Sequence, residues 1–251
     1  IYSAEKALSY LRVVNGSNDQ VASLFPAVNK TTLKNVNVVY GQSDPAAGDV
    51  SLTPASSAGS VIYFGGLVGY AEASTISGCS VSTANGKTVT VMLHSMLSEN
   101  AKNDNYNAAG ALVARTKNVS LTDCSAENVT LSLKPSDGGW NNVSSRNYFG
   151  GLVGVVDCSV DGNTLEGLKT TNVDLTVEKS TLGSDKNISL GGLIGRVWTG
   201  GRNLTIDATW GLSASDADIV ANLELDRAGV SNQLFVGSLI GDLTGNQGSG
   251  S

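Results

Sequence analysis

Four carboxylates in this sequence are candidate catalytic residues for an enzyme that acts on carbohydrate: Asp157, Asp161, Glu166 and Asp174. Glycosidases use paired carboxylates, and polysaccharide lyases use acids that hold calcium beside a basic residue. None of the four recurs in register with a lysine or arginine, and acids at such spacing also serve as turn residues on solvated faces. The acids are therefore weak evidence for catalysis.

The histidine and the cysteines form no catalytic or metal-binding motif. His94 is the only histidine, and it lies in a polar stretch with no predicted partner for a serine nucleophile. Cys79, Cys124 and Cys158 are too few, and odd in number, for a disulfide framework. We expect Cys79 and Cys124 to be stacked, buried and reduced, because small thiols pack as hydrophobic groups. The sequence predicts no catalytic residue, no metal site and no cofactor.

Aromatic and amide side chains give the strongest indication of binding. Trp140, Asn141 and Asn142 follow two glycines in a polar stretch, Tyr148 comes shortly after, and Tyr106 has a comparable place one stretch earlier. Amphipathic rings on stacked loops suit the recognition of a sugar or a peptide, because such rings anchor interfaces. We predict these five residues to be ligand-binding, with Trp140 and Tyr106 exposed. The alternative is that Trp140 folds back over the edge of the core.

The elements that position these residues follow from a repeated glycine-rich phrase. Its five copies occupy residues 65–69, 110–114, 150–154, 191–195 and 237–241, and their leucines are 45, 40, 41 and 46 residues apart. Self-similarity at a period of about 20–50 residues is the signature of a repeat array. The residues around each leucine are Gly, Ala or Ser, which let a strand approach a neighbouring layer or turn a corner.

The residues after each leucine extend the alignment. Leu33, Val36 and Val38 follow Leu24 at the same offsets at which Ile76, Cys79 and Val81 follow Leu67, and Leu121, Cys124 and Ala126 follow Leu112. In the next unit Leu165 and Leu168 take the first two places after a four-residue insertion. Each unit reads as three short strands: the glycine phrase, the Ile-x-x-Cys-x-Val stretch and a β-branched run such as residues 173–177.

The sequence thus predicts an all-β, single-domain parallel β-solenoid of about five to six repeats over residues 21–245. Polar stretches at 41–60, 93–107, 133–147, 178–187 and 226–233 enter at one point of the unit, so they line one edge of the stack. Residues 1–20 are predicted to form an N-terminal cap with a short helix that begins at Ser3, and residues 246–251 a flexible tail.

Composition excludes two classes of partner. The chain has 16 Lys and Arg against 22 Asp and Glu, for a net charge of −6, whereas nucleic acid and anionic membranes require clustered cations. No apolar run approaches the ~20 residues of a membrane-spanning helix. We expect a monomer or a segment of a larger chain.

The glycine phrase and residues 23–38 resemble the GLUG-repeat family, named for the phrase seen here at residues 65–69. The resemblance covers roughly residues 20–245, and Phe25-Pro26 departs from the usual Phe-Gly. It implies a bacterial cell-surface or secreted protein and supplies no catalytic residues. The resulting hypothesis is a non-catalytic adhesion module or stalk that binds a glycan or a host or bacterial surface protein. The alternative is a carbohydrate-active β-helix enzyme or its substrate-binding accessory domain.

Overall fold

The computed structural model describes residues 21–40, 50–52, 63–84, 89–93, 106–135, 146–160, 162–182, 187–200, 209, 211–216, 218–225 and 233–244. No α-helix occurs in these ranges, where the regular elements are β-strands. In particular, they hold no helix with the length and hydropathy that a membrane crossing needs. The predicted helix within residues 1–20 and the predicted tail at 246–251 both lie outside the described residues.

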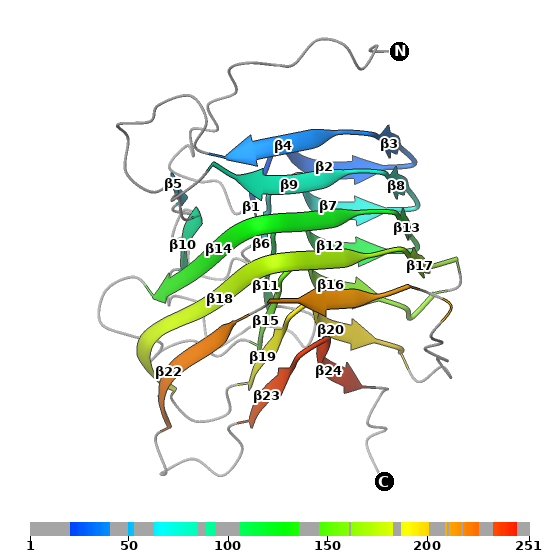
Figure 1. Ribbon diagram of the computed structural model, residues 1–251. Helices are drawn as coiled ribbons and strands as arrows, with labels where there is room; N and C mark the ends of the chain where they lie inside the picture. Colours follow the sequence, from blue (N-terminus) through cyan, green and yellow to red (C-terminus); the bar gives the residue numbers. More distant parts are fainter. Residues whose placement is uncertain are drawn as a thin grey trace, which may run out of the picture.

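The strands form four parallel sheets, here called A to D, and within each sheet the strands of successive units are stacked along one axis (Figure 1). Sheet A contains β1 (Val21–Ala22), β6 (Tyr63–Gly65), β11 (Tyr106–Gly110), β15 (Arg146–Gly150), β19 (Asn187–Gly191) and β23 (Gln233–Gly237). Sheet B contains β2 (Phe25–Asn29), β7 (Val68–Glu72), β12 (Val113–Lys117), β16 (Val153–Asp157), β20 (Ile194–Trp198) and β24 (Ile240–Thr244). Sheet C contains β3 (Thr32–Lys34), β8 (Thr75–Ser77), β13 (Ser120–Thr122) and β17 (Thr164–Glu166). Sheet D contains β4 (Asn37–Tyr40), β5 (Val50–Leu52), β9 (Ser80–Thr83), β10 (Val89–Leu93), β14 (Ser125–Pro135), β18 (Lys169–Leu182), β21 (Ser213–Ser215) and β22 (Ile219–Leu225).

Successive units pair in register. The chain passes through sheets A, B, C and D in turn, and each strand pairs with its equivalent in the next unit. The first glycines of the five phrases, for example, are consecutive partners in sheet A, from Gly65 through Gly110 to Gly237. The predicted all-β, parallel arrangement is confirmed, and six strands each in sheets A and B agree with five to six units.

A corner divides the glycine phrase between two strands, so its prediction as a single strand is wrong. In the third unit β11 ends at Gly110 and β12 begins at Val113, with the phrase turning the chain from sheet A into sheet B. A Cβ at Gly150, the equivalent of Gly110, would lie 2.0 Å from the carbonyl oxygen of Val153. A side chain therefore cannot fit inside this turn, which explains why the position is Gly in all five copies.

A second corner divides the stretch that was predicted as one strand after the glycine phrase. Residues in the left-handed conformation separate sheet C from sheet D in the first four units; they are Asn35, Gly78, Asp123 and Gly167, with φ between 53° and 62°. Gly, Asn and Asp are the residues that tolerate this conformation best. Each of these four units consequently has strands in four sheets rather than the three strands predicted. The β-branched runs form part of β14 and β18, which are 11 and 14 residues long.

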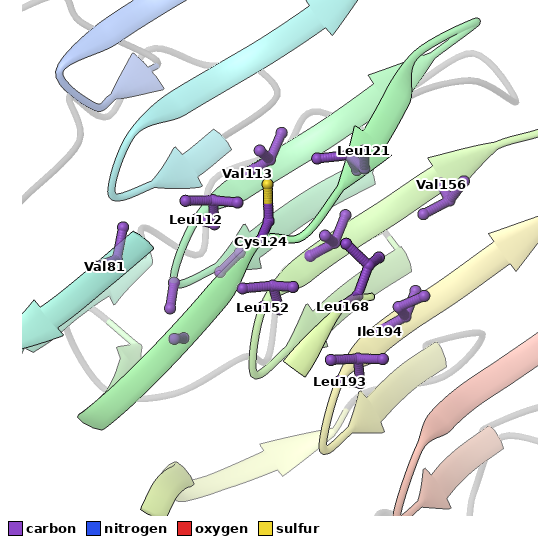
Figure 2. Close-up of a cluster of buried hydrophobic side chains, with 14 of the residues drawn as sticks. Val81, Leu112, Val113, Leu121, Cys124, Leu152, Val156, Leu168, Leu193 and Ile194 are labelled. Carbon is purple, nitrogen blue, oxygen red and sulfur yellow. The ribbon is translucent and has the colours of Figure 1, made fainter. Parts of the chain in front are cut away.

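The leucines of the phrase form an interior column. Leu67, Leu112, Leu152 and Leu193 are each 0% exposed, and Leu239 in the last unit is partly buried. Each of the first four donates its backbone N–H to the carbonyl of the next leucine, over 2.9 to 3.0 Å. Figure 2 shows Leu112, Leu152 and Leu193 side by side in the core. The prediction that these leucines stack along one axis is confirmed.

Cys79 and Cys124 are stacked, buried and not joined by a disulfide, as predicted. Cys79 and Cys124 are fully buried and free, and they stand on neighbouring units, where Ser125 N–H donates to the Cys79 carbonyl over 3.0 Å. Lys169 N–H makes the equivalent bond to Cys124, which places Leu168 next in this column. The four-residue insertion inferred for that unit is thus confirmed. Parallel side chains in register point the same way, so no disulfide joins them.

Candidate functional site

The structure corrects the predicted binding strip. Trp140, Asn141 and Asn142 lie outside the described residues. Tyr106 is 5% exposed and Tyr148 is 1% exposed, so the prediction that Tyr106 presents an exposed ring is wrong. Both residues begin or lie within sheet A strands, and the adjoining sheet B covers their rings.

These tyrosines belong to a small apolar cluster that is separate from the main core. Ala108, Ala114 and Val155 complete the cluster, with Tyr63 packed against it. The residues come from sheets A and B, on the faces turned away from the leucine column. At Gly154 the two sheets come so close that a Cβ would lie 2.6 Å from the Ala114 carbonyl oxygen and 2.8 Å from the Ala109 nitrogen.

On these faces, two columns of side chains run along the stack, one on sheet A and one on sheet B. The sheet A column is Val21, Tyr63, Ala108, Tyr148, Ser189 and Phe235, and the sheet B column is Ala27, Tyr70, Arg115, Val155, Arg196 and Asp242. Together with Tyr106, the tyrosines and arginines of these columns are called the tyrosine–arginine strip.

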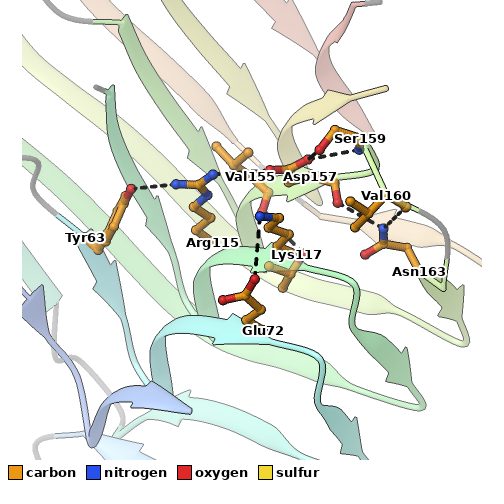
Figure 3. Close-up of polar contacts among 10 residues, drawn as sticks. Tyr63, Glu72, Arg115, Lys117, Val155, Asp157, Ser159, Val160 and Asn163 are labelled. Atoms are coloured by element: carbon orange, nitrogen blue, oxygen red, sulfur yellow. Dashed lines mark hydrogen bonds and ion pairs between the residues drawn. The ribbon is translucent and has the colours of Figure 1, made fainter. Parts of the chain in front are cut away.

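Arg115 is the centre of the first half of the strip. Its Nη1 donates to the Tyr63 hydroxyl over 3.2 Å, and its Nη2 lies 3.2 Å from the Asp157 carboxylate (Figure 3). The guanidinium carbon is 5.3 Å from the ring centroid of Tyr70 and 5.1 Å from that of Tyr106, within the range of cation–π attraction. Arg115 therefore joins three units through rings and charge.

Arg196 repeats the arrangement two units further along. Its guanidinium lies 4.7 Å from the Tyr148 ring centroid, and its Nη1 donates to the Tyr148 hydroxyl. Its Nε lies 3.3 Å from the Asp242 carboxylate, and its Nη2 donates to the Thr244 hydroxyl over 2.7 Å. In both cases an arginine on sheet B reaches back to a tyrosine on the preceding unit of sheet A. Here the tyrosine and arginine fill the space between the sheets.

The first half of the strip is hollow instead. An open cavity of about 400 Å³ is lined by Val21, Pro26, Ala27, Tyr63, Tyr70 and Arg115. The lining comes from β1, β2, β6, β7 and β12, so the cavity spans three units. The two columns begin with the small side chains of Val21 and Ala27, which leave space that the larger Tyr148 and Arg196 side chains fill further along the stack.

Among the described residues, the buried Nε of Arg115, which lines the cavity, has no hydrogen-bond partner, and neither has the buried hydroxyl of Tyr106, whose ring lies against the Arg115 guanidinium. Such groups normally bind another polar atom or water, because leaving them unpaired costs about 1–3 kcal/mol. Burial raises the pKa of Tyr106 well above its usual range, and it raises the pKa of Tyr70 to about 12, an effect that Arg115 opposes and Glu72 increases. Both phenols are therefore neutral hydrogen-bonding groups at physiological pH.

The charges around the cavity are already paired. Asp157 is 1% exposed, accepts hydrogen bonds from the backbone N–H and the hydroxyl of Ser159, and compensates the charge of Arg115. Lys117 lies 3.5 Å from Glu72 on the neighbouring strand of sheet B (Figure 3). The cavity consequently offers aromatic faces and hydrogen bonds rather than a free charge.

The carboxylates considered for catalysis do not converge. Asp157 stands on sheet B, Glu166 on sheet C and Asp174 on sheet D, and Asp161 lies outside the described residues, as does His94. The described residues contain no group of three or more His, Cys, Asp and Glu placed to hold a metal. Burial and the neighbouring Asp157 raise the pKa of the Cys158 thiol to about 11, so this thiol is protonated and unreactive at neutral pH.

The arginines of the strip were not predicted as site residues, although the repeat alignment contains a pattern that marks them. Position three after the repeat leucine is Tyr70, Arg115, Val155, Arg196 and Asp242 in successive units, among columns of small or apolar residues. Position four before the leucine holds two tyrosines. The alignment shows that the tyrosines form one column and the arginines another. It does not show that the two columns are neighbours, because this depends on the corner at the glycine phrase, which folds sheet A against sheet B.

Comparison of the chain with protein families, curated proteins and solved structures found no match.

Proposed function

We propose that this chain is a β-solenoid of the GLUG-repeat type that acts as a non-catalytic binding module, or as the ligand-binding stalk of a larger adhesin, at the bacterial surface or in the secreted space. The in-register parallel stack of equivalent strands supports the solenoid. The resemblance of the glycine phrases and of residues 23–38 to GLUG repeats supports the cellular setting.

The observation that carries the binding function is the cavity beside Arg115. Ligand sites are concave, mostly apolar and furnished with a few placed polar groups. This cavity has three aliphatic side chains, two tyrosines and an arginine whose Nε is buried without a partner. The open space beside these side chains makes the cavity a better candidate than the part of the strip where Arg196 packs against Tyr148.

The carbohydrate-active enzyme is the weaker candidate. Its acids would have to lie on neighbouring strands of one sheet, whereas Asp157, Glu166 and Asp174 stand on three different sheets. Asp157 is moreover held by Arg115 and Ser159 rather than directed at the cavity.

The test is a binding screen of the whole chain against a glycan array and a panel of extracellular host proteins. Tyr70→Ala removes a ring that lines the cavity, and Trp198→Ala removes an aromatic ring from the same sheet three units away, outside the cavity lining. We expect at least one ligand whose binding falls more than tenfold in Tyr70→Ala and is unchanged in Trp198→Ala. Absence of any Tyr70-dependent ligand, or turnover of a polysaccharide in a lyase or hydrolase assay, would refute the proposal.

A further inference from the structure

The chemistry of the cavity selects among the ligands that a binding module can take. We infer that it binds an uncharged sugar residue of a glycan, and this inference rests on the proposed binding function.

The lining matches the two kinds of surface on a sugar ring. Tyr63 and Tyr70 contribute rings, and Val21, Pro26 and Ala27 contribute aliphatic surface, which suit the C–H face of a hexose. The phenol groups of Tyr63 and Tyr70 suit its hydroxyls, which both donate and accept. At about 400 Å³ the cavity lies near the lower end of the ~300–1,000 Å³ typical of small-ligand sites. That size suits one or two sugar rings.

The charges argue against an acidic sugar. Among the described residues that line the cavity, Arg115 is the only cation, and the Asp157 carboxylate 3.2 Å from its Nη2 already balances it. The next cation along the sheet, Lys117, is paired with Glu72 over 3.5 Å. Glu72 is about one-third exposed and neighbours Tyr70 closely enough to raise its pKa. An incoming carboxylate would therefore meet a like charge and gain no free cation.

Backbone pairing argues against an extended peptide at the central strands of the cavity. Peptides that bind to β-proteins commonly add a strand to an open sheet edge. Among the lining strands, β6, β7 and β12 are each paired on both sides, by β1 and β11, by β2 and β12, and by β7 and β16, whereas β1 and β2, which carry Val21, Pro26 and Ala27, are the first strands of sheets A and B. Beside Tyr63, Tyr70 and Arg115 the backbone groups are therefore used within the sheets, so recognition there falls to side chains, as in sugar binding.

The experiment compares lactose, maltose and cellobiose with glucuronic acid and N-acetylneuraminic acid by ligand-observed NMR and calorimetry on the whole chain. We expect at least one neutral sugar to bind, with more than tenfold weaker binding in Tyr70→Ala and no change in Trp198→Ala. Binding of the neutral sugar should change less than twofold between 50 and 500 mM NaCl, since no net charge is neutralised. The acids should bind at least tenfold more weakly.

Glu72→Gln separates the electrostatic argument from folding, because Glu72 is partly exposed and its ion pair with Lys117 is worth little. This variant should bind the neutral sugar as before and bind the acids more tightly than the unaltered chain does. Tighter binding of acids than of neutral sugars, or failure of every neutral sugar, would overturn the inference. If a host protein nevertheless binds in a Tyr70-dependent manner, the proposed binding function stands while the sugar assignment is wrong.

Discussion

Truncation of one leucine in the interior column tests whether the units are stacked as described. Leu152 is 0% exposed and lies between Leu112 and Leu193, which are equally buried. Leu152→Ala removes this side chain from the middle of the stack. The backbone on both sides is held by hydrogen bonds of 2.9 Å, from Leu112 N–H to Leu152 and from Leu152 N–H to Leu193, so the site cannot collapse easily.

The magnitude follows from burial and from this rigidity. Leucine-to-alanine changes in protein cores cost about 2–5 kcal/mol, with the larger values where a cavity persists. We expect Leu152→Ala to lower the free energy of unfolding by about 3–5 kcal/mol. Leu239→Ala is the matched control, because Leu239 belongs to the same column but is only partly buried, in the last described unit. It should cost about 1–2 kcal/mol.

The assay is urea denaturation followed by circular dichroism and tryptophan fluorescence. Stacked repeats do not always unfold in one step, so the two probes must give coincident transitions before free energies are compared. Equal costs for the two variants, or a loss below about 1 kcal/mol for Leu152→Ala, would show that the leucines do not share one interior column.

Two further perturbations test the approach of sheets A and B and the buried thiols. Gly154→Ala places a Cβ within 2.6–2.9 Å of backbone atoms of Ala114 and Ala109, so we expect overpacking to cost about 1–3 kcal/mol in the same denaturation assay; an unchanged midpoint would contradict the close contact. The folded-state pKa of Cys158, about 11, lies above the usual thiol value of about 8.5, so its contribution to stability is complete below pH 8.5 and is lost as pH rises toward 11. Denaturation midpoints between pH 8 and 11 should therefore fall less in Cys158→Ala than in the unaltered chain, and equal slopes would argue against a buried thiol.

The periodic positions were predictable because each is required by every unit. The leucine, the small residues around it and the cysteine column recur at fixed offsets, and stacking leaves one interior surface for them. The four-residue insertion before Leu165 was predictable for the same reason, since only one alignment returns Leu165 and Leu168 to the core.

The corners and the tyrosine–arginine strip could not be predicted from the sequence. A glycine-rich apolar phrase is compatible with a strand and with a turn, and only the contact between the Gly150 position and the Val153 carbonyl decides for the turn. The sequence predicts an exposed Tyr106 because this residue lies within the polar stretch at 93–107. Its burial depends on sheet B, whose residues come later in the chain.

The sequence by itself determined the repeat, the parallel stacking of like strands and the identity of the core columns, because these depend on periodicity and on the burial of apolar side chains. Tertiary structure alone decided that sheets A and B fold together on the side away from the core. That folding brings Arg115 within reach of Tyr63, 52 residues earlier, and of Asp157, 42 residues later. Such contacts depend on the angle at the glycine corner, a property of backbone geometry that no pattern of side-chain types encodes on its own.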